Sequence, residues 1–214
     1  MSKLLPIADP VAHARQVTGY EASVLTADRP WGPFAAFHTT GEFERTGEKV
    51  FHQHCGPTAI TNVICTLERR RGMVPSDPAA VFRRVSDIGR RRLTYWNIHE
   101  KVHLGGTSYL LLQGYVARCL REFGIQSARV RGHLLASPEQ MASELGRGRL
   151  LVLSMTRHRC YGSHLVTAYG AVRVAVEGRG KPRLYLLVAD GWAARPRYIA
   201  ADTLGLCGYV AVEV

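Results

Sequence analysis

The sequence predicts an α+β protein, in which a helical N-terminal part is followed by an antiparallel β-sheet. Apolar residues recur at helical spacing in several segments between Cys55 and Gly148. After Gly148 the pattern changes to short runs rich in Leu, Val and Tyr that are separated by turn residues. Helices first and strands afterwards favour this class over an alternating βαβ fold. A length of 214 residues suits a single domain.

The first 48 residues show Pro, Gly and aromatic residues without a sustained period. They predict an irregular N-terminal lead, with a short strand near Ala35 to His38. We expect this lead to belong to the same domain as residues 49–214, which carry the motifs described below.

The first expected helix follows Cys55. Pro57 suits its first turn, where no N–H is needed, and Gly72 suits its end. Its apolar face contains Ala59, Ile60, Val63, Ile64 and Leu67. The later helices are expected from Pro78 with Ser76 or Asp77 as cap, from about Thr107 to Phe123 with Ser108 as cap and Gly124 as stop, and from Ser137 with Gln140 completing a capping box.

The expected strands follow in the last third of the chain. They are "LLVLSM" (150–155), "HLVTAYGAVRVAV" (164–176), "RLYLLVAD" (183–190), "RPRYIAA" (195–201) and "GYVAVEV" (208–214). The segment "EGRGKP" (177–182) is typical of a hairpin connection between two of them.

Composition narrows the protein class. At 46% hydrophobic and 21% charged residues the chain is ordinary for a globular protein. No apolar run approaches the roughly 18 residues that a membrane span needs, and the N-terminus lacks the apolar core of a signal peptide. We therefore expect a cytoplasmic protein without a membrane partner. An odd number of cysteines, five, predicts free thiols.

The formal charge of +11 is the one unusual property of the composition. Basic residues cluster at "ERRRG", "RRVSDIGRRR" and "RHR". None of these clusters belongs to a nucleic-acid reader motif, and no aromatic residues are interleaved with them. We interpret them as solvated surface and do not expect a nucleic-acid partner.

Cys55 is the candidate nucleophile. A helix start lowers the pKa of a thiol, because unpaired N–H groups and the helix dipole stabilise the thiolate. Gly56 would allow a substrate backbone to approach closely, and the N–H of Cys55 would help to bind an oxyanion. A thiol also needs a base and a group that orients the base. His164 at the head of a strand and Asp190 at the end of the next strand are the best candidates, with Trp192 shielding their contact.

Three motifs in this order resemble a known family. "HCGPTAITN", "GSHLVTAYG" and "VADGW" resemble the papain-like cysteine peptidases, most closely the bacterial group related to the double-glycine leader peptidases that process bacteriocin precursors. The resemblance covers about Val50 to Val214. It implies the papain-like fold, with Cys55 as nucleophile, His164 as general base and acid, and Asp190 orienting the imidazole.

The sequence departs from that family at the oxyanion hole. The family usually has a Gln six residues before the nucleophile, where this chain has Lys49. Gln53 is the alternative donor. If the segment before Cys55 is extended, Gln53 and His54 point to opposite faces, so that only one of them faces the cleft. The residues alone do not decide which.

A zinc site is the competing interpretation. His52, His54 and Cys55 lie close in sequence, as do His158, Cys160 and His164, and His99 and His103 have the spacing of one helix face. No paired Cys-x-x-Cys motif accompanies them. We therefore expect neither a metal nor another cofactor.

Three functions follow from these residues. The first is a cysteine peptidase that hydrolyses a peptide or isopeptide bond of a peptide or protein substrate through an acyl-enzyme. The second is an acyltransferase, similar to a transglutaminase, that uses the same triad. The third is a catalytically silent papain-like domain that binds a peptide or an acidic partner. The substrate and the oligomeric state stay open at this stage.

Overall fold

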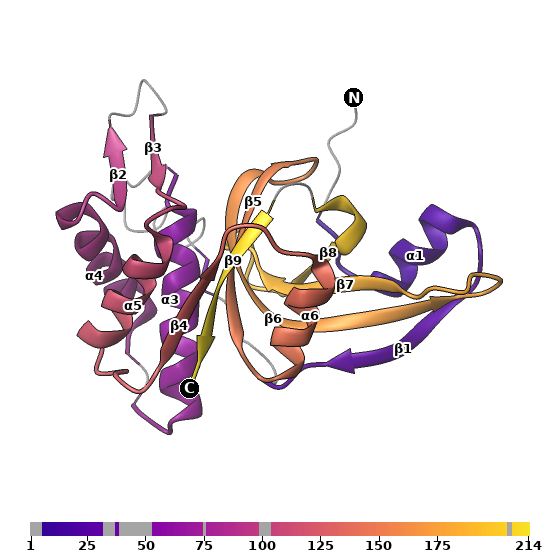
Figure 1. The fold of residues 1–214 in the computed structure, drawn as a ribbon, viewed down its shortest axis with the longest axis horizontal. Coiled ribbons are helices and arrows are strands. Elements are labelled where there is room, and N and C mark those ends of the chain that lie inside the picture. Colours follow the sequence, from indigo (N-terminus) through magenta and orange to yellow (C-terminus); the bar gives the residue numbers. More distant parts are fainter. Residues whose placement is uncertain (1–5, 32–36, 39–52, 75, 99–103, 205–206) are drawn as a thin grey trace.

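The computed structural model describes residues 6–31, 37–38, 53–74, 76–98, 104–204 and 207–214, and the chain within these ranges is α+β (Figure 1). Its helices are α1 (Pro10–Thr18), α3 (Cys55–Arg70), α4 (Pro78–Arg91), α5 (Leu112–Glu122), α6 (Pro138–Gly146) and a short 3₁₀ turn at Ala201–Thr203. Its strands are β1 (Ala22–Asp28), β2 (Tyr95–Ile98), β3 (Leu104–Thr107), β4 (Arg129–His133), β5 (Leu150–His158), β6 (Gly162–Val176), β7 (Arg183–Ala189), β8 (Arg197–Ala200) and β9 (Cys207–Glu213).

The main sheet has the order β4-β9-β5-β6-β7-β8, and β1 pairs with the C-terminal part of β6, from Ala171 to Val176. Every pairing in it is antiparallel. Strands β2 and β3 form a separate hairpin beside the helices (Figure 1). The fold class expected from the sequence is confirmed at the level of α+β.

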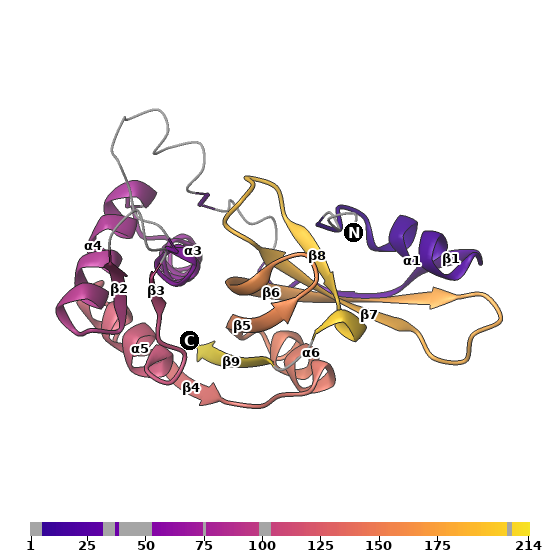
Figure 2. The same cartoon turned by 90° about the horizontal axis from the view of Figure 1, so that it is seen from above.

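The sheet separates two apolar cores. Alternate residues of a strand point to opposite faces, so neighbours such as Val152 and Leu153 enter different cores. On one face the sheet packs against α3 and α5, with α4 packed on these two helices, and on the other face against α6. Figure 2 shows the three helices gathered on one side of the sheet. Helix α3 is central, since most of its residues are buried.

The local capping predictions are mostly confirmed. The side chain of Asp77 caps α4, and Ser137 with Gln140 forms the expected capping box of α6. Gly72 and Gly124 follow the ends of α3 and α5 in the left-handed conformation, with φ of +65° and +71°. These features depend on residues only a few positions apart, which explains why the sequence predicts them.

The expected helix from Thr107 is wrong at its start. Thr107 ends β3, where it pairs with Tyr95, and α5 begins at Leu112 after Leu111 rather than after Ser108. The N–H of Ser108 instead donates to the carbonyl of Thr94. A hairpin with a partner distant in sequence overrides the local helix pattern.

The expected order of helices first and strands afterwards also needs correction. The N-terminal lead contains α1 and β1, and β1 pairs with β6 of the main sheet. β4 is a further strand that precedes the last helix. Of the strand expected near Ala35 to His38, Ala35 lies outside the described residues, while Phe37 and His38 are not in a strand. Among the helices described, none is both long enough and apolar enough to cross a bilayer.

Candidate active site

Cys55 is the first residue of α3, and the sheet holds this helix start in place. The hydroxyl of Thr167 on β6 donates a buried hydrogen bond of 2.8 Å to the carbonyl of Ala59, one turn into α3. Thr167 lies three residues after His164 on the same strand. The sequence therefore carries, on one strand, both the candidate base and the side chain that binds the candidate nucleophile's helix.

His164 and Asp190 come together through the pairing of β6 with β7. Thr167 lies opposite Ala189, which places Asp190, the next residue, near the head of β6. The His164 ring nitrogen Nε2 lies 2.8 Å from the main-chain carbonyl oxygen of Asp190. The expectation that neighbouring strands place these two residues side by side is confirmed.

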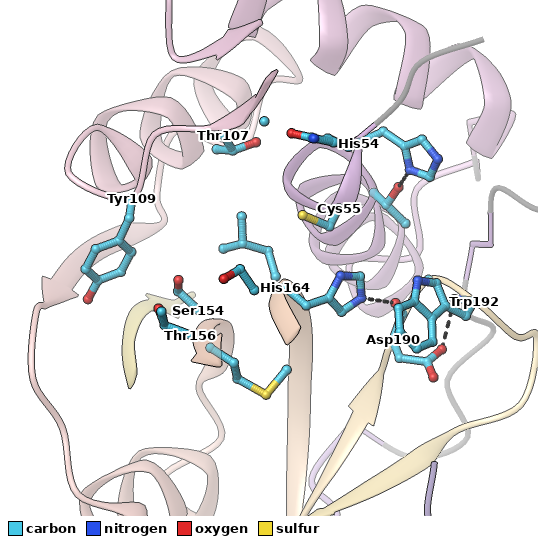
Figure 3. Close-up of a pocket in the computed structure, with 16 residues that line it drawn as sticks. His54, Cys55, Thr107, Tyr109, Ser154, Thr156, His164, Asp190 and Trp192 are labelled. Carbon is cyan, nitrogen blue, oxygen red and sulfur yellow. Dashed lines mark hydrogen bonds between the residues drawn. The ribbon is translucent and has the colours of Figure 1, made fainter. Parts of the chain in front are cut away.

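The three residues line one cavity of about 460 Å³ between α3 and the sheet. Figure 3 shows the sulfur of Cys55 directed into this cavity and His164 between Cys55 and Asp190. Gln53, His54 and Trp192 also line it, and Tyr109, Ser154 and Thr156 form its opposite wall. A cavity with a thiol, an imidazole and a few polar groups has the form of a small catalytic cleft.

The bond between His164 and Asp190 differs from the one expected. A carbonyl oxygen only accepts hydrogen bonds, so Nε2 of His164 carries the proton and Nδ1 is the basic nitrogen. The main chain of Asp190, and not its carboxylate, therefore selects the tautomer. No hydrogen bond reaches Nδ1, or joins His164 to Cys55, from any residue that the structure describes.

The carboxylate of Asp190 is buried, with 1% of the residue exposed, and is occupied by other partners. Its Oδ1 accepts from the main-chain N–H groups of Trp192 at 2.9 Å and Ala193 at 3.2 Å. Its Oδ2 accepts from the hydroxyl of Tyr161 at 3.3 Å. The carboxylate thus organises the turn after β7 and the aromatic residues beside His164.

The imidazole of His164 packs in a cluster with two aromatic rings, those of Tyr161 and Trp192, whose own centroids lie 4.9 Å apart. The ring of Tyr161 stacks on it with centroids 5.6 Å apart and an angle of 3° between the planes. Trp192 packs against it at 4.8 Å and 40°. Trp192, the residue expected to shield the contact between His164 and Asp190, packs against the imidazole, and 43% of the residue is exposed. The two rings leave the imidazole little freedom to rotate.

Burial opposes charge on both reacting groups. It raises the pKa of the Cys55 thiol, although the main-chain groups of Leu165, Gly56 and Cys55 itself act in the opposite direction. It lowers the pKa of His164, partly offset by the carbonyl and the charge of Asp190. The main-chain groups at the helix start therefore lower the pKa of the thiol as expected, but desolvation raises it by more. The two shifts favour a neutral thiol and a neutral imidazole.

Gln53 and His54 both line the cavity, so the premise that they lie on opposite faces of an extended segment is wrong. Gln53 has a φ of +57°, a left-handed conformation that is uncommon outside glycine. Its amide oxygen lies beside Gly106 at the end of β3. Nδ1 of His54 pairs with the Thr58 hydroxyl at 3.3 Å, and its ring packs on Phe82. Lys49 and His52 lie outside the described residues.

Gly56 has a role other than the one expected. It is buried and does not line the cavity. A Cβ atom on Gly56 would lie 1.9 Å from Oγ1 of Thr107, so the missing side chain makes room for β3 against α3. The sequence correctly indicates a close approach at this glycine, but the neighbour is a threonine of the same chain.

Tyr161 is the site residue that sequence reasoning missed. It lies three residues before His164, and two residues this far apart on a regular strand point to opposite faces. Gly162, with a φ of +66°, bends the chain between them and brings the two rings together. The glycine in "CYGSH" is the local pattern that points to this turn.

The described residues contain no group of three or more His, Cys, Asp or Glu side chains that could hold a metal ion. His52, His99 and His103 of the zinc interpretation lie outside them. All five cysteines are described, and all are free thiols. Comparison with known protein families and with curated protein sequences found no match.

Proposed function

We propose that this protein is a cysteine hydrolase, a peptidase of papain-like type, that cleaves a peptide or isopeptide bond. The observation that carries the proposal is the arrangement around one cavity. Cys55 at a helix start and His164 on the adjacent strand both open into it, and the Nε2 of His164 is held by Asp190. This leaves Nδ1 as the base on an imidazole of fixed tautomer, as nucleophilic catalysis by a thiol requires.

The proposed reaction begins with a neutral pair. Nδ1 of His164 takes the thiol proton as Sγ of Cys55 bonds to the substrate carbonyl carbon, and the carbonyl electron pair moves to oxygen. The C–N bond then breaks as the imidazolium gives its proton to the leaving amine. Water attacks the acyl-enzyme with His164 again as base, and the C–S bond breaks to return the thiol.

The candidate oxyanion hole combines two donors at the start of α3. The N–H of Cys55 belongs to the first turn of the helix, where main-chain donors have no partner within the helix. The side-chain amide of Gln53 lines the same cavity. The left-handed backbone of Gln53 also supports a role, because such conformations concentrate at active sites.

The arrangement of helix and sheet around the site supports the papain-like class. The helix that carries the thiol packs against an antiparallel sheet that carries the imidazole, and the order of the residues along the chain is Cys, His, Asp. An acyltransferase would use the same groups with an amine or thiol in place of water. The silent binding domain is favoured by a different observation, the raised pKa of Cys55.

The rate of Cys55 alkylation by iodoacetamide, followed against pH by intact mass, tests the proposal. We expect a rate that depends on His164 and that His164→Ala lowers by about a hundredfold. Cys65→Ala is the matched control, since Cys65 lies on the same helix and burial raises its pKa to about 12. An unchanged rate in His164→Ala would support the silent domain. Added amine or thiol acceptors separate the transferase from the hydrolase.

A further inference from the structure

Tyr161 lies behind His164 and does not line the cavity that contains Cys55. It forms part of the wall of a second cavity of about 680 Å³ on the other side, with His158 and Cys160. Only 6% of Tyr161 is exposed. Tyr161 therefore contacts the imidazole from outside the cavity that contains Cys55.

Tyr161 contacts His164, Asp190 and His158, and its ring also packs on that of Trp192 at 4.9 Å. The face of its ring stacks on His164 with nearly parallel planes. Its hydroxyl donates to Oδ2 of Asp190, whose carbonyl oxygen binds the same imidazole. Its main-chain N–H donates to Nδ1 of His158 at 3.2 Å. Tyr161 thus contacts the imidazole ring of His164 and also Asp190, the residue that binds this imidazole.

Asp190 acts on the imidazole in two ways. Its main-chain carbonyl binds Nε2 directly, and its side-chain carboxylate acts through Tyr161. One carboxylate oxygen accepts from the hydroxyl of Tyr161 and the other from the N–H of Trp192, and the rings of these two residues contact both the imidazole and each other. A single buried carboxylate therefore sets the positions of both rings, while its own main chain selects the tautomer.

We propose that Tyr161 is a positioning residue for His164, which fixes the imidazole plane together with Trp192 and keeps Nε2 on the carbonyl of Asp190. This inference rests on the proposed function, since positioning matters only if His164 acts as a base. A small displacement of a catalytic group lowers rates by about a hundredfold in favourable cases, so the expected loss is measurable.

The test uses two variants of Tyr161 and two of a matched tyrosine. Tyr161→Leu removes the stacked ring, whereas Tyr161→Phe removes only the bond to Asp190. Tyr185→Leu and Tyr185→Phe are the controls, because Tyr185 is a buried tyrosine of the same sheet that pairs with His13 and does not line the candidate active site. Urea unfolding confirms that each variant is folded.

Two readouts are needed, the His164-dependent rate of Cys55 alkylation and the ¹⁵N shifts of the His164 ring, which report its tautomer. We expect Tyr161→Leu to lower the rate by about tenfold or more and to mix the tautomers. Tyr161→Phe should lower it by about threefold, and the Tyr185 variants should match wild type. Wild-type rate and spectrum in Tyr161→Phe overturn the proposal, even where Tyr161→Leu does not fold.

The ring spectrum also separates this proposal from the proposed function. A wild-type thiol that reacts independently of His164 contradicts the proposed function. In that case a change of tautomer in the Tyr161 variants still supports positioning by Tyr161, and an unchanged tautomer contradicts it. A normal His164-dependent rate in both Tyr161 variants contradicts positioning alone.

Discussion

Two histidines on either side of Tyr161 show how the same residue type serves different ends. His158 ends β5 and His164 lies near the start of β6, and the ring of Tyr161 packs against both. Burial lowers the pKa of each. The pKa therefore does not distinguish a structural histidine from a candidate base in this site.

Their hydrogen bonds do distinguish them. Nδ1 of His158 accepts the N–H groups of Cys160 and Tyr161, each at 3.2 Å. Its Nε2 donates to the Thr203 hydroxyl at 3.0 Å, because that hydroxyl donates to the carbonyl of Ala200. Both nitrogens of His158 are engaged, whereas the structure records a partner only for Nε2 of His164 among the described residues. The comparison teaches that a nitrogen open to a cavity, and not a shifted pKa, identifies the base.

The largest effect should come from removing the base. His164→Ala is expected to lower Cys55 alkylation by about a hundredfold, and any peptide hydrolysis by at least as much, the usual contribution of a general base. His158→Asn is the matched control and should stay within about tenfold of wild type, because its Oδ1 still accepts the two N–H groups. Equal losses of rate in the two variants would contradict the assignment of His164, and not His158, as the base. Both rates are measured by intact mass.

The second prediction concerns stability, for which His158 should matter more than His164. His158→Leu leaves the part-buried N–H of Cys160 and the buried N–H of Tyr161 without their acceptor and should lower the free energy of unfolding by about 1–3 kcal/mol. His158→Asn should recover part of this loss. Urea unfolding at pH 7.5 measures both variants. A stable His158→Leu protein would show that the loop between β5 and β6 does not need this histidine.

A smaller effect is expected from Asp190→Asn. The main-chain carbonyl that binds Nε2 is unchanged, and the Asn oxygen still accepts from Trp192 and Ala193. The loss of alkylation rate should stay below about tenfold, since only the charge near the imidazole and the bond to Tyr161 are altered. A carboxylate that oriented the imidazole directly would give a loss of about ten-thousandfold. A loss of that size would contradict the orientation of His164 by the main chain.

The smallest effect is a pH dependence. Unfolded histidines take up protons near pH 6.5, but His13, His158 and His164 do so at lower pH in the folded state. The unfolded state therefore binds more protons below about pH 6.5, and stability should fall as the pH decreases from that value. Urea midpoints between pH 7.5 and 5 measure this, with a shallower dependence expected in His158→Asn.

The same shift of His164 has the opposite consequence for activity. A base works only in its neutral form, and His164 stays neutral at a lower pH than a free imidazole. The acid limb of the alkylation profile should therefore lie below about pH 6.5. An acid limb above that value would mean that a nearby negative charge, rather than burial, dominates the imidazole.

The sequence predicted the parts of the site that depend on near neighbours. Cys55 at a helix start follows from Gly56, Pro57 and the apolar period behind them, and the strand ends at His164 and Asp190 follow from short apolar runs. Helix α1 could have been predicted by the same reasoning, because Asp9 caps it, but it was missed. In contrast, β1 is exposed along most of its length and shows no alternation, so only its pairing with β6 makes it a strand.

By itself the sequence determined the local setting of each candidate residue, a helix start or a strand end, because hydrophobic period, caps and turns act over a few positions. It placed Cys55, His164 and Asp190 at neighbouring ends of a helix and two strands. Only the tertiary structure decided how they meet: that the carbonyl of Asp190 holds the imidazole, that its carboxylate holds Tyr161, and that burial outweighs the helix start at Cys55. Hydrogen-bond direction and desolvation depend on every group packed around an atom, and those groups are distant along the chain.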